Sequence, residues 1–290
     1  MANKLQRNFQ LIIQANSDAA QYITVQPPFT IEFDITRDTH ASSNIASIRI
    51  YNLSEKNRNK ILKDPSDYNS FRLVTLQVGY GNNLSTILVG NITQCWSVRE
   101  GNNFITQIQS FDGGFAAVNG RADIEFPAGT SRQVVIETLA KSLTQYNLKP
   151  GAIGKFDGTI DRGNSYSGNT MDKLKELTND GVFVDNGVIH CLNNTEAIDG
   201  KIFTVSAATG LLGTPMRESQ FLNFDMLLEP SLKLGYQINL QSSTSKYSGN
   251  YKVIALKHKG AISGAASGEA ITSVGVAPGQ FSTLFQQVGF

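Results

Sequence analysis

Two distant segments of the chain share one short pattern of apolar, polar, apolar, Gly and Tyr residues. The first lies at 76–80 and the second at 232–236. A Gly-Asn pair follows each segment and opens an alternating strand, and a last strand comes after it, at 104–111 and 270–276. We therefore predict that the chain builds a similar β unit twice, although five positions can also match by chance between unrelated β segments.

Composition and charge narrow the classes of protein to which the chain can belong. A length of 290 residues favours about two domains. The net charge of +1 argues against sequence-specific nucleic-acid binding. No window approaches the roughly 20 apolar residues that cross a bilayer, so we expect no stable membrane insertion. Residues 1–7 lack the apolar core of a secretion signal, which favours folding in a cytosol, and Cys95 and Cys191 are expected to be buried, reduced thiols.

The first third of the chain, residues 1–118, is expected to be a β domain. Residues 29–35 alternate cleanly between apolar and polar side chains, and Ser54 is placed to cap a short helix at 55–63. Further strands are expected at 9–13, 46–51, 72–78, 86–96 and 104–111. The turns between them are spaced as in a barrel or a sandwich.

The middle of the chain, residues 119–198, is expected to be a small α+β domain. The run from Thr130 has capping-box form and precedes a helix with Val135, Leu139 and Leu143 on one face. A Gly-rich connector at 151–168 leads to a second helix, which is capped near Asn169 or Thr170 and has Met171, Leu174 and Leu177 on one face. A hairpin at 182–190 follows, because Asn186-Gly187 supplies the positive φ angles of a tight turn.

The last third, residues 199–280, returns to β structure and is followed by a tail at 281–290. Strands are expected at 202–205, 221–227, 236–240, 251–258 and 270–276. The basic cluster of Lys252, Lys257, His258 and Lys259 is interpreted as a solvated strand edge that discourages unwanted pairing.

The tail is the main candidate contact surface of the chain, because five apolar side chains crowd its ten residues. They are Phe281, Leu284, Phe285, Val288 and Phe290. Such a patch is rarely left in water. The tail is expected to fold back on its own core, to dock on a neighbouring subunit or partner, or to be disordered.

The sequence contains few residues in arrangements typical of catalysis, so we predict no catalytic residue, no metal site and no cofactor. His190 and Cys191 are neighbours, but adjacent strand residues point to opposite faces. The chain has no Gly-x-Ser-x-Gly elbow. Asp157 and Asp161 would be an acid/base pair in a glycan-cleaving enzyme, but acids in a Gly-rich connector are better explained as solvated.

At the level of segment order, the chain resembles the baseplate hub proteins of phage tails, which are related to the hub part of type VI secretion spikes. The passages that carry the resemblance lie at 48–54, 74–80, 89–92, 210–215, 227–235, 249–253 and 257–260. The resemblance implies a mainly β fold with an α+β insert. Two related β-barrel domains, at 1–118 and 199–280, would flank a small two-helix plus hairpin domain at 119–198.

The same resemblance implies a structural, non-enzymatic role. A homotrimer would present two barrels per copy as a pseudo-sixfold ring, which adapts a hexameric tail tube to a trimeric central spike or needle and leaves a channel for DNA. The hub would contact other baseplate proteins in the virion, after assembly in the cytoplasm of the bacterial host. The chain is short for the family and has no lysozyme-like or peptidase-like segment, which puts a cell-wall-degrading role in doubt.

Two alternatives remain open at this point. One is a cell-wall- or glycan-cleaving tail enzyme that uses Asp157 and Asp161. The other is a glycan- or receptor-binding β module, against which the lone Trp96 counts because it stands in a strand beside Cys95 and not in an aromatic platform.

Overall fold

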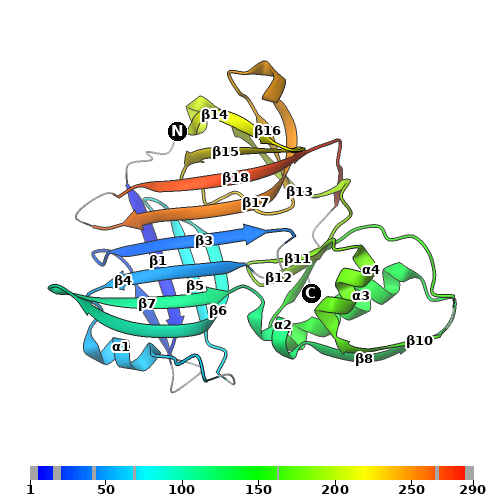
Figure 1. Ribbon diagram of the computed structural model, residues 1–290, viewed down its shortest axis with the longest axis horizontal. Helices are drawn as coiled ribbons and strands as arrows, with labels where there is room; N and C mark the ends of the chain where they lie inside the picture. The colour runs from blue at the N-terminus through cyan, green and yellow to red at the C-terminus, as the bar shows by residue number, and fades with distance from the viewer. Residues whose placement is uncertain are drawn as a thin grey trace.

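The computed structural model describes residues 6–15, 21–40, 44–67, 70–161, 163–264 and 268–284. Strands dominate these residues, and most strands belong to one sheet of 14 strands (Figure 1). The mainly β fold class is therefore confirmed. In the described part of the chain, no helix has both the length and the apolar character needed to span a membrane.

The first β region, called the front unit, has all its neighbouring strands antiparallel, in the order β3-β4-β7-β6-β5-β1-β2. Its elements are β1 (Arg7–Gln14), β2 (Tyr22–Val25), β3 (Ile31–Asp38), β4 (Ile45–Tyr51), α1 (Glu55–Ile61), β5 (Leu73–Tyr80), β6 (Asn83–Glu100) and β7 (Asn103–Phe111). Helix α1 begins after Ser54 as predicted, but the Ser54 side chain makes no capping hydrogen bond.

The second β region, called the rear unit, repeats this strand order. Its elements are β13 (Glu196–Val205), η2 (Ala207–Thr209), β14 (Leu211–Glu218), β15 (Phe221–Leu227), β16 (Tyr236–Leu240), η3 (Ser245–Tyr247), β17 (Gly249–Ile262), β18 (Ala270–Pro278) and β19 (Ser282–Leu284). The order β14-β15-β18-β17-β16-β13 matches β3-β4-β7-β6-β5-β1 strand by strand. One ladder differs, because β13 and β16 run parallel whereas β1 and β5 run antiparallel.

The match extends to an irregularity in the longest strand of each unit. The register of β6 with β7 shifts between Ile92 and Gln94, and the register of β17 with β18 shifts between Val253 and Ala255. A bulge adds a residue to one strand and bends it. Aligning the two bulges makes Ile92 of β6 equivalent to Val253 of β17 and extends along the neighbouring strands through their pairing. The seven residues of β15 then align with the seven residues of β4.

The short echo in the sequence does not mark equivalent positions. Gly79 and Tyr80 end β5, whereas Gly235 and Tyr236 stand at the start of β16. The five matching residues are therefore a chance similarity. The repetition lies in the hydrogen-bonded ladders and not in the amino acids that suggested it.

The described residues form no closed barrel, contrary to the two barrels expected for 1–118 and 199–280. Instead β3 pairs with β17, from Ile31 against Ile262 to Asp38 against Ala255, and the two units merge into one continuous sheet. The rear strands lie above the front strands in Figure 1. The physical reason is strand length, since β16 covers β17 only from Gly249 to Lys252 and leaves the rest of that edge to β3.

The basic cluster expected at a solvated strand edge lies within the sheet. Strand β17 has β18 on one side and β3 on the other. Lys252 and His258 are buried, while Lys257 and Lys259 alternate with them and are exposed. The prediction of an edge was wrong, because charge alone does not tell which strand lies beside another.

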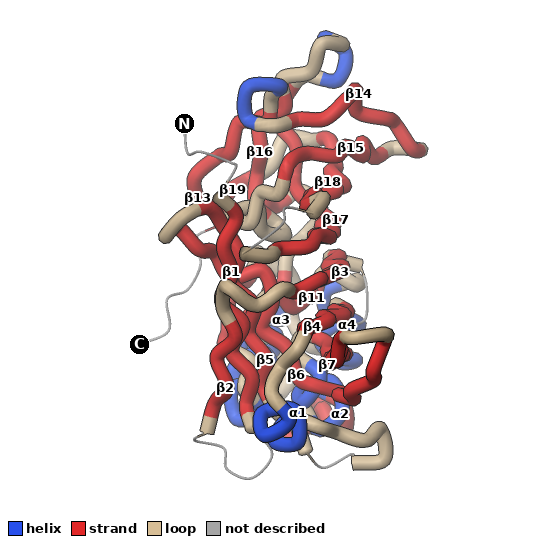
Figure 2. Tube along the Cα trace, turned by 90° about the vertical axis from the view of Figure 1, so that its left-hand side faces the viewer, coloured by secondary structure: helices blue, strands red, loops and turns tan. Residues whose placement is uncertain are grey.

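The front unit folds over on itself in two layers. Strands β1, β2 and β5 lie behind β3, β4 and β7 in Figure 1, and the layers stand side by side in Figure 2. Strand β6 belongs to both layers, because its partner changes from β5 to β7 at Asn91. Buried apolar side chains such as Phe9, Ile35 and Ile48 form the core of this unit.

The insert contains the predicted helices and hairpin. Its elements are α2 (Gly114–Asn119), β8 (Arg121–Phe126), α3 (Arg132–Ser142), η1 (Leu143–Tyr146), β9 (Lys149–Ile153), β10 (Asn164–Asn169), α4 (Thr170–Thr178), β11 (Val182–Asp185) and β12 (Val188–Cys191). Asn169 caps α4, and Asn186 and Gly187 have the expected positive φ angles of 54° and 76°. Ser131 caps α3 by accepting from the Val134 N–H, so the predicted capping box is replaced by a simple cap.

Strands form both ends of the Gly-rich connector at 151–168. Strand β9 extends into its beginning and pairs in parallel with β12, and β10 forms its end and pairs with β8. The unpaired stretch is therefore shorter than the composition suggests. The two cysteines, Cys95 and Cys191, are buried and unbridged, as predicted.

Candidate functional site

A buried ionic cluster joins the front unit, the insert and the rear unit. We call it the Arg37 cluster, and it consists of Arg37, Asp185, His258 and Thr272. Arg37 lies on β3 and donates from Nη1 to Oδ1 of Asp185 on β11 at 2.6 Å. Its Nη2 lies 2.9 Å from Nε2 of His258 on β17, and Nδ1 of His258 lies 2.9 Å from Oγ1 of Thr272 on β18. One arginine therefore holds three regions together.

The chemistry of arginine determines where His258 carries its proton. A guanidinium donates hydrogen bonds and never accepts them, so Nε2 of His258 is the acceptor. Nδ1 then carries the proton and donates to Thr272. Burial, and after it the charge of Arg37, lowers the pKa of His258 well below its usual value. The ring is therefore neutral, and Asp185 balances the charge of Arg37.

A second buried acid, Asp112, holds the turn of the insert hairpin. Its Oδ1 accepts from the Gly187 N–H at 2.9 Å. Burial, with a contribution from the charge of Asp185, raises the pKa of Asp112 to about 7 although backbone hydrogen bonds at the turn oppose the shift. Asn44 adds a bond from Nδ2 to the Val184 carbonyl at 2.7 Å. Two side chains of the front unit thus bind the β11–β12 hairpin.

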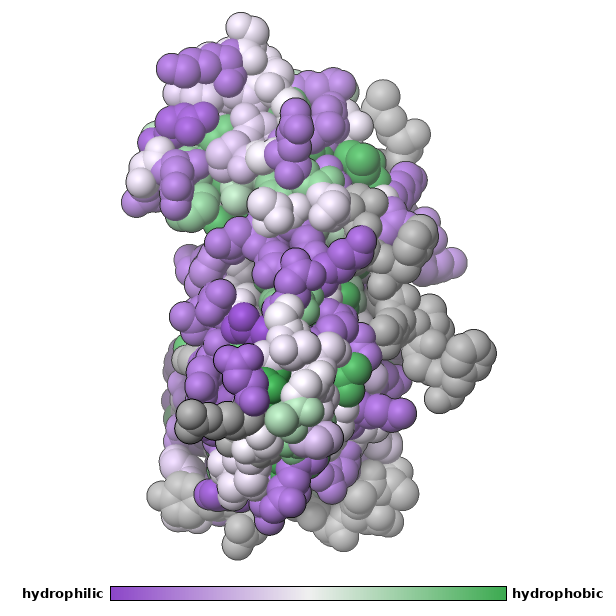
Figure 3. Space-filling model, turned by 90° about the vertical axis from the view of Figure 1, so that its right-hand side faces the viewer, coloured by the Kyte–Doolittle hydropathy of each residue, from purple (hydrophilic) through white to green (hydrophobic). Residues whose placement is uncertain are grey.

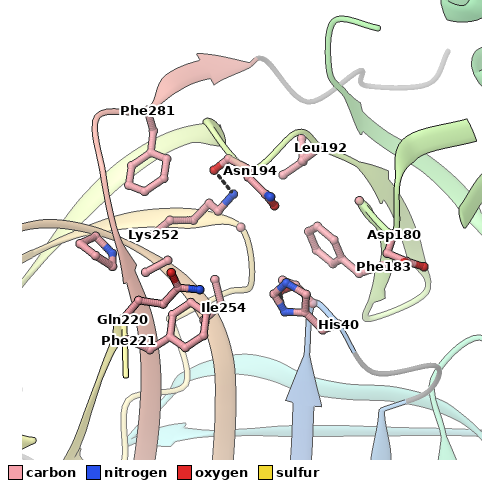
Figure 4. A pocket seen from close by; sticks show the side chains of 15 residues that line it. His40, Asp180, Phe183, Leu192, Asn194, Gln220, Phe221, Lys252, Ile254 and Phe281 are labelled. Atoms are coloured by element: carbon pink, nitrogen blue, oxygen red, sulfur yellow. Dashed lines mark hydrogen bonds between the residues drawn. The ribbon is translucent and has the colours of Figure 1, made fainter. Parts of the chain in front are cut away.

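A cavity of about 290 Å³ opens between the same three regions (Figure 4). Lys252 and Ile254 of β17 face Phe183 of the insert hairpin across it, and His40 and Phe281 complete the wall. The lining combines aromatic side chains with the buried ammonium group of Lys252. What the cavity can bind therefore depends on whether this ammonium group is free to make hydrogen bonds.

The ammonium group of Lys252 is fully used by the backbone. Its Nζ donates to the carbonyl oxygens of Asn193, Asn194 and Glu196 at 3.4, 3.0 and 2.9 Å. Burial lowers the pKa of Lys252 to about 8, and the nearby Glu196 carboxylate opposes that shift. The Phe281 ring centroid lies 5.3 Å from Nζ. An ammonium has three protons, so Lys252 braces the start of β13 and is not placed as a nucleophile.

The structure places part of the predicted contact tail against its own chain. Phe281 lines the cavity beside Lys252. Leu284 belongs to β19, which pairs in parallel with β13. Phe285, Val288 and Phe290 lie outside the described residues, so their role as contacts stays a prediction.

The residues weighed for catalysis are not brought together. Asp157 and Asp161 are both exposed, whereas a general acid gains its properties from a desolvated site. His190 is buried, accepts at Nδ1 from the Ala152 N–H at 3.0 Å and stacks on Phe183. Burial lowers the pKa of His190 to about 4. In the part of the chain that the structure describes, no three His, Cys, Asp or Glu side chains gather as metal ligands.

Reasoning from the sequence missed the Arg37 cluster. The signal was present in β17, where Leu256 and His258 share one face of the strand and Lys257 and Lys259 share the other. A period of two therefore assigns His258 to the core. Nothing local in the sequence indicates that Arg37 and Asp185 are its partners.

Several strands expose apolar side chains that a monomer would leave in water, among them Ile45 on β4 and Ile202 on β13, which are 63% and 48% exposed. Met216 and Leu212 on β14 are 72% and 38% exposed, and Val98 on β6 is 37% exposed. The insert side of the molecule is different. Among the described residues in Figure 3, hydrophilic side chains cover most of that face and apolar ones emerge in separate patches. Strand β14 carries the most exposed large apolar side chain among the described residues, Met216, and is therefore the first candidate assembly surface.

The baseplate hub gp41 family matches residues 9–261 of the sequence. This stretch includes the insert, nearly all of the front unit, and the rear unit from β13 to β17. Among curated proteins, none matches the sequence.

Solved structures with the same fold include tail proteins and a component of a type VI secretion system. The 43 kDa tail protein of prophage MuSo2 from Shewanella oneidensis has a TM-score of 0.58 at 9% identity, over 93% of this chain and 98% of that one. A tail protein from Neisseria meningitidis MC58 has a TM-score of 0.57 at 8% identity, over 93% and 96%. A type VI secretion component of E. coli, described as similar to the T4 tail proteins gp27 and gp5, has a TM-score of 0.54 at 9% identity, over 94% and 78%. At these identities the likeness establishes the fold.

Proposed function

The chain belongs to the baseplate hub gp41 family, and from this membership we propose that it is the non-enzymatic structural hub of a phage tail baseplate. Its work is to bury surface against other tail proteins and not to make or break bonds. It is assembled in the cytoplasm of the bacterial host and then resides in the virion tail.

The hub acts as a symmetry adaptor. Three copies, each with a front and a rear β unit, form a ring with six similar positions. One face of the ring meets a hexameric tail tube, and the other meets a trimeric central spike or needle, beside other baseplate proteins. The observation that carries this proposal is the strand order shared by the two units, together with the bulge at the same place in β6 and β17.

The division of labour along the chain follows the same scheme. Residues 1–118 and 199–280 supply the ring, residues 119–198 form the insert between them, and residues 281–290 contact a neighbouring subunit or partner. In that tail the contact side chains are Phe285, Val288 and Phe290, because Phe281 lies beside Lys252 and the strand with Leu284 pairs with β13 of the same chain. The net charge of +1 suits a channel through which DNA passes without being held.

The test is the symmetry of the hub in purified tails, determined by electron cryomicroscopy. We expect one ring of three copies whose inner wall repeats six times, between the tube and the spike. A hub with any other number of copies, or a ring in which only one β unit of each copy takes part, would overturn the proposal.

A peptidoglycan zymogram tests the non-enzymatic character separately. The purified protein should give no clearing. Clearing that disappears in the Asp157→Asn/Asp161→Asn variant would instead make the chain a muralytic tail enzyme.

A further inference from the structure

We propose that β14 of one copy pairs antiparallel with the second half of β6 in the next copy. This contact would repeat, between copies, the ladder that β3 and β17 form within one chain. The inference rests on the proposed ring of three copies and names the surfaces that close it.

The equivalence of the two β units leads to this pairing. In the shared strand order, β14 takes the place of β3 and β6 takes the place of β17. Within the chain, β3 of the front unit pairs with β17 of the rear unit. If each strand of this ladder is replaced by its equivalent in the other unit, the result is a ladder between β14 of a rear unit and β6 of a front unit. In one chain these strands lie at opposite ends of the stack, so they can meet only between copies (Figure 1).

Closure of the ring follows from counting the contacts. Each copy supplies one β3·β17 ladder of its own and one β14·β6 ladder with its neighbour. The contact joins two different surfaces, and such head-to-tail contacts close into rings when the rotation permits. Three copies would then have six equivalent junctions around the channel.

Both strand edges are available for this pairing. Among the described strands, β14 is hydrogen-bonded to β15 alone. Strand β6 has β7 on one edge, and on the other edge Lys63 forms a single bridge with Cys95. Peptide groups alternate between the two edges of a strand, so those of Ser97 and Arg99 face the same edge as those of Cys95. No described segment pairs with them there, and such an edge is a template for another strand.

The register of this ladder can be read from the internal one. Asp34 of β3 stands opposite Lys259 of β17. Met216 takes the place of Asp34, because the two residues pair with equivalent positions of β15 and β4. Val98 takes the place of Lys259 when the two bulges are superposed. The alignment therefore sets Met216 opposite Val98.

This register brings together two apolar side chains that each chain exposes on its own. Met216 is 72% exposed and Val98 is 37% exposed. A shift of register in β14 between Leu212 and Met216 leaves Met216 to Glu218 as its regular part. The contact is therefore short, and burial of Met216 on Val98 would be its apolar centre.

Disulfide trapping in assembled tails tests the register. Ser97 and Arg99 direct their peptide groups to the shared edge, so Val98 and Met216 would form a non-hydrogen-bonded pair with Cα atoms about 4.5 Å apart. That distance suits a disulfide. We expect tails that carry Met216→Cys/Val98→Cys to yield a covalent trimer after mild oxidation, seen on a non-reducing gel and lost on reduction. The native Cys95 and Cys191 are buried and do not compete.

Two controls separate the register from chance collisions. Met216→Cys/Glu100→Cys is displaced by two residues on the same face, with Cα atoms about 7–8 Å apart, and should cross-link at least about tenfold more slowly. Tails assembled from a mixture of the two single variants should give covalent dimers and nothing larger.

The outcomes distinguish this inference from the function on which it rests. A threefold hub that cross-links no faster through Val98 than through Glu100 would overturn the β14·β6 pairing and leave the hub proposal intact. Covalent ladders longer than three copies would also overturn it, because an open chain of contacts does not close the ring. A hub without threefold symmetry would overturn both.

Discussion

Strands β17 and β6 hold the same place in the two β units, but their outer edges differ. The edge of β17 is covered by β3 from Ala255 to Ile262. On the matching stretch of β6, the backbone pairing that the described residues make at this edge is the single bridge between Lys63 and Cys95. The covered edge contains His258 of the Arg37 cluster, whereas superposition of the bulges sets Ser97 at that position of β6.

The difference concerns where charge can be buried. A contact made as the chain folds can enclose an ion pair, because its partners are delivered together and its hydrogen bonds are completed inside the core. A contact between copies would have to strip water from both charges at each assembly event. Uncharged Ser97 and apolar Val98 at the open edge avoid that cost. The permanent junction thus encloses a buried ion pair, whereas Met216 and Val98, at the centre of the proposed junction, carry no charge and the neighbouring Arg217 is exposed.

The permanent junction should be the more sensitive of the two, and Arg37→Met tests it most severely. The change leaves the buried Asp185 without its counter-charge and His258 without a donor. Removing one partner of a buried ion pair costs about 3–5 kcal/mol. We expect a loss of that size in the free energy of unfolding, measured by urea denaturation followed by circular dichroism.

Arg49→Met is the matched control for Arg37→Met. Arg49 also forms ion pairs, with Glu32 and Glu100, but its side chain is 33% exposed. Exposed pairs contribute about 0–1 kcal/mol. Equal losses at Arg37 and Arg49 would contradict the view that the internal junction depends on buried charge.

The pH dependence of stability gives a second test of the same junction through Asp112→Asn. Burial raises the pKa of Asp112 from 3.8 to about 7, so between these values the folded protein holds a proton that the unfolded chain releases. The contribution of Asp112 to stability is therefore complete below about pH 4 and is lost as the pH rises toward 7. Asn keeps the oxygen that accepts from Gly187 and does not titrate. As the pH rises through this window, we expect the free energy of unfolding of Asp112→Asn to increase relative to that of the unmodified protein, by up to about 1.4 kcal/mol per pH unit.

Unfolding midpoints at a series of pH values measure this gain. Asp157→Asn, at an exposed carboxyl group, should follow the unmodified protein throughout. A constant offset for Asp112→Asn from pH 4 to 8 would mean that Asp112 does not titrate in this range.

Local signals in the sequence predicted local structure well. The alternation at 29–35 predicted β3, Asn169 predicted the cap of α4, and Asn186-Gly187 predicted the hairpin turn. Each of these features depends on residues within one turn or one strand. The sequence could therefore define the elements without defining their neighbours.

The arrangement of the elements could not be predicted in the same way. The β3·β17 ladder joins Arg37 to Leu256 across most of the chain, and its strength depends on how much of β17 the short β16 leaves uncovered. The Arg37 cluster follows from that ladder, so it was out of reach as well. The duplication was predicted from an echo whose two copies occupy different ends of their strands, and a correct expectation thus rested on a chance match.

A smaller effect is expected at Lys252, which has a counterpart in the front unit. Superposition of the bulges sets Lys252 on Asn91, and each of these buried side chains binds the backbone of another segment. Lys252→Met would leave three carbonyl groups at the start of β13 without their donor. Unsatisfied buried groups cost about 1–3 kcal/mol, which thermal unfolding would detect.

Lys257→Met is the control for Lys252→Met, because Lys257 lies on the exposed face of the same strand and pairs with Asp34. Lys257→Met should lower the free energy of unfolding by less than about 1 kcal/mol. A loss at Lys252 no greater than at Lys257 would mean that the backbone around β13 is held by its own ladder with β16.

The open edge should show the smallest effect on folding, and Met216→Asn tests it. Met216 is 72% exposed in the single chain, so its replacement should change the free energy of unfolding by no more than about 0.5 kcal/mol. The same change would place an amide against Val98 of the next copy and remove apolar burial from the proposed junction. We therefore expect normal unfolding but a clear fall in the amount of hub recovered in purified tails, measured by quantitative immunoblotting. Val118→Asn is the matched control, since Val118 is 58% exposed and lies on α2, outside both strands of the proposed junction. A fall in recovery for both variants would point to solubility and not to the β14 edge, and normal recovery for both would mean that copies do not meet there.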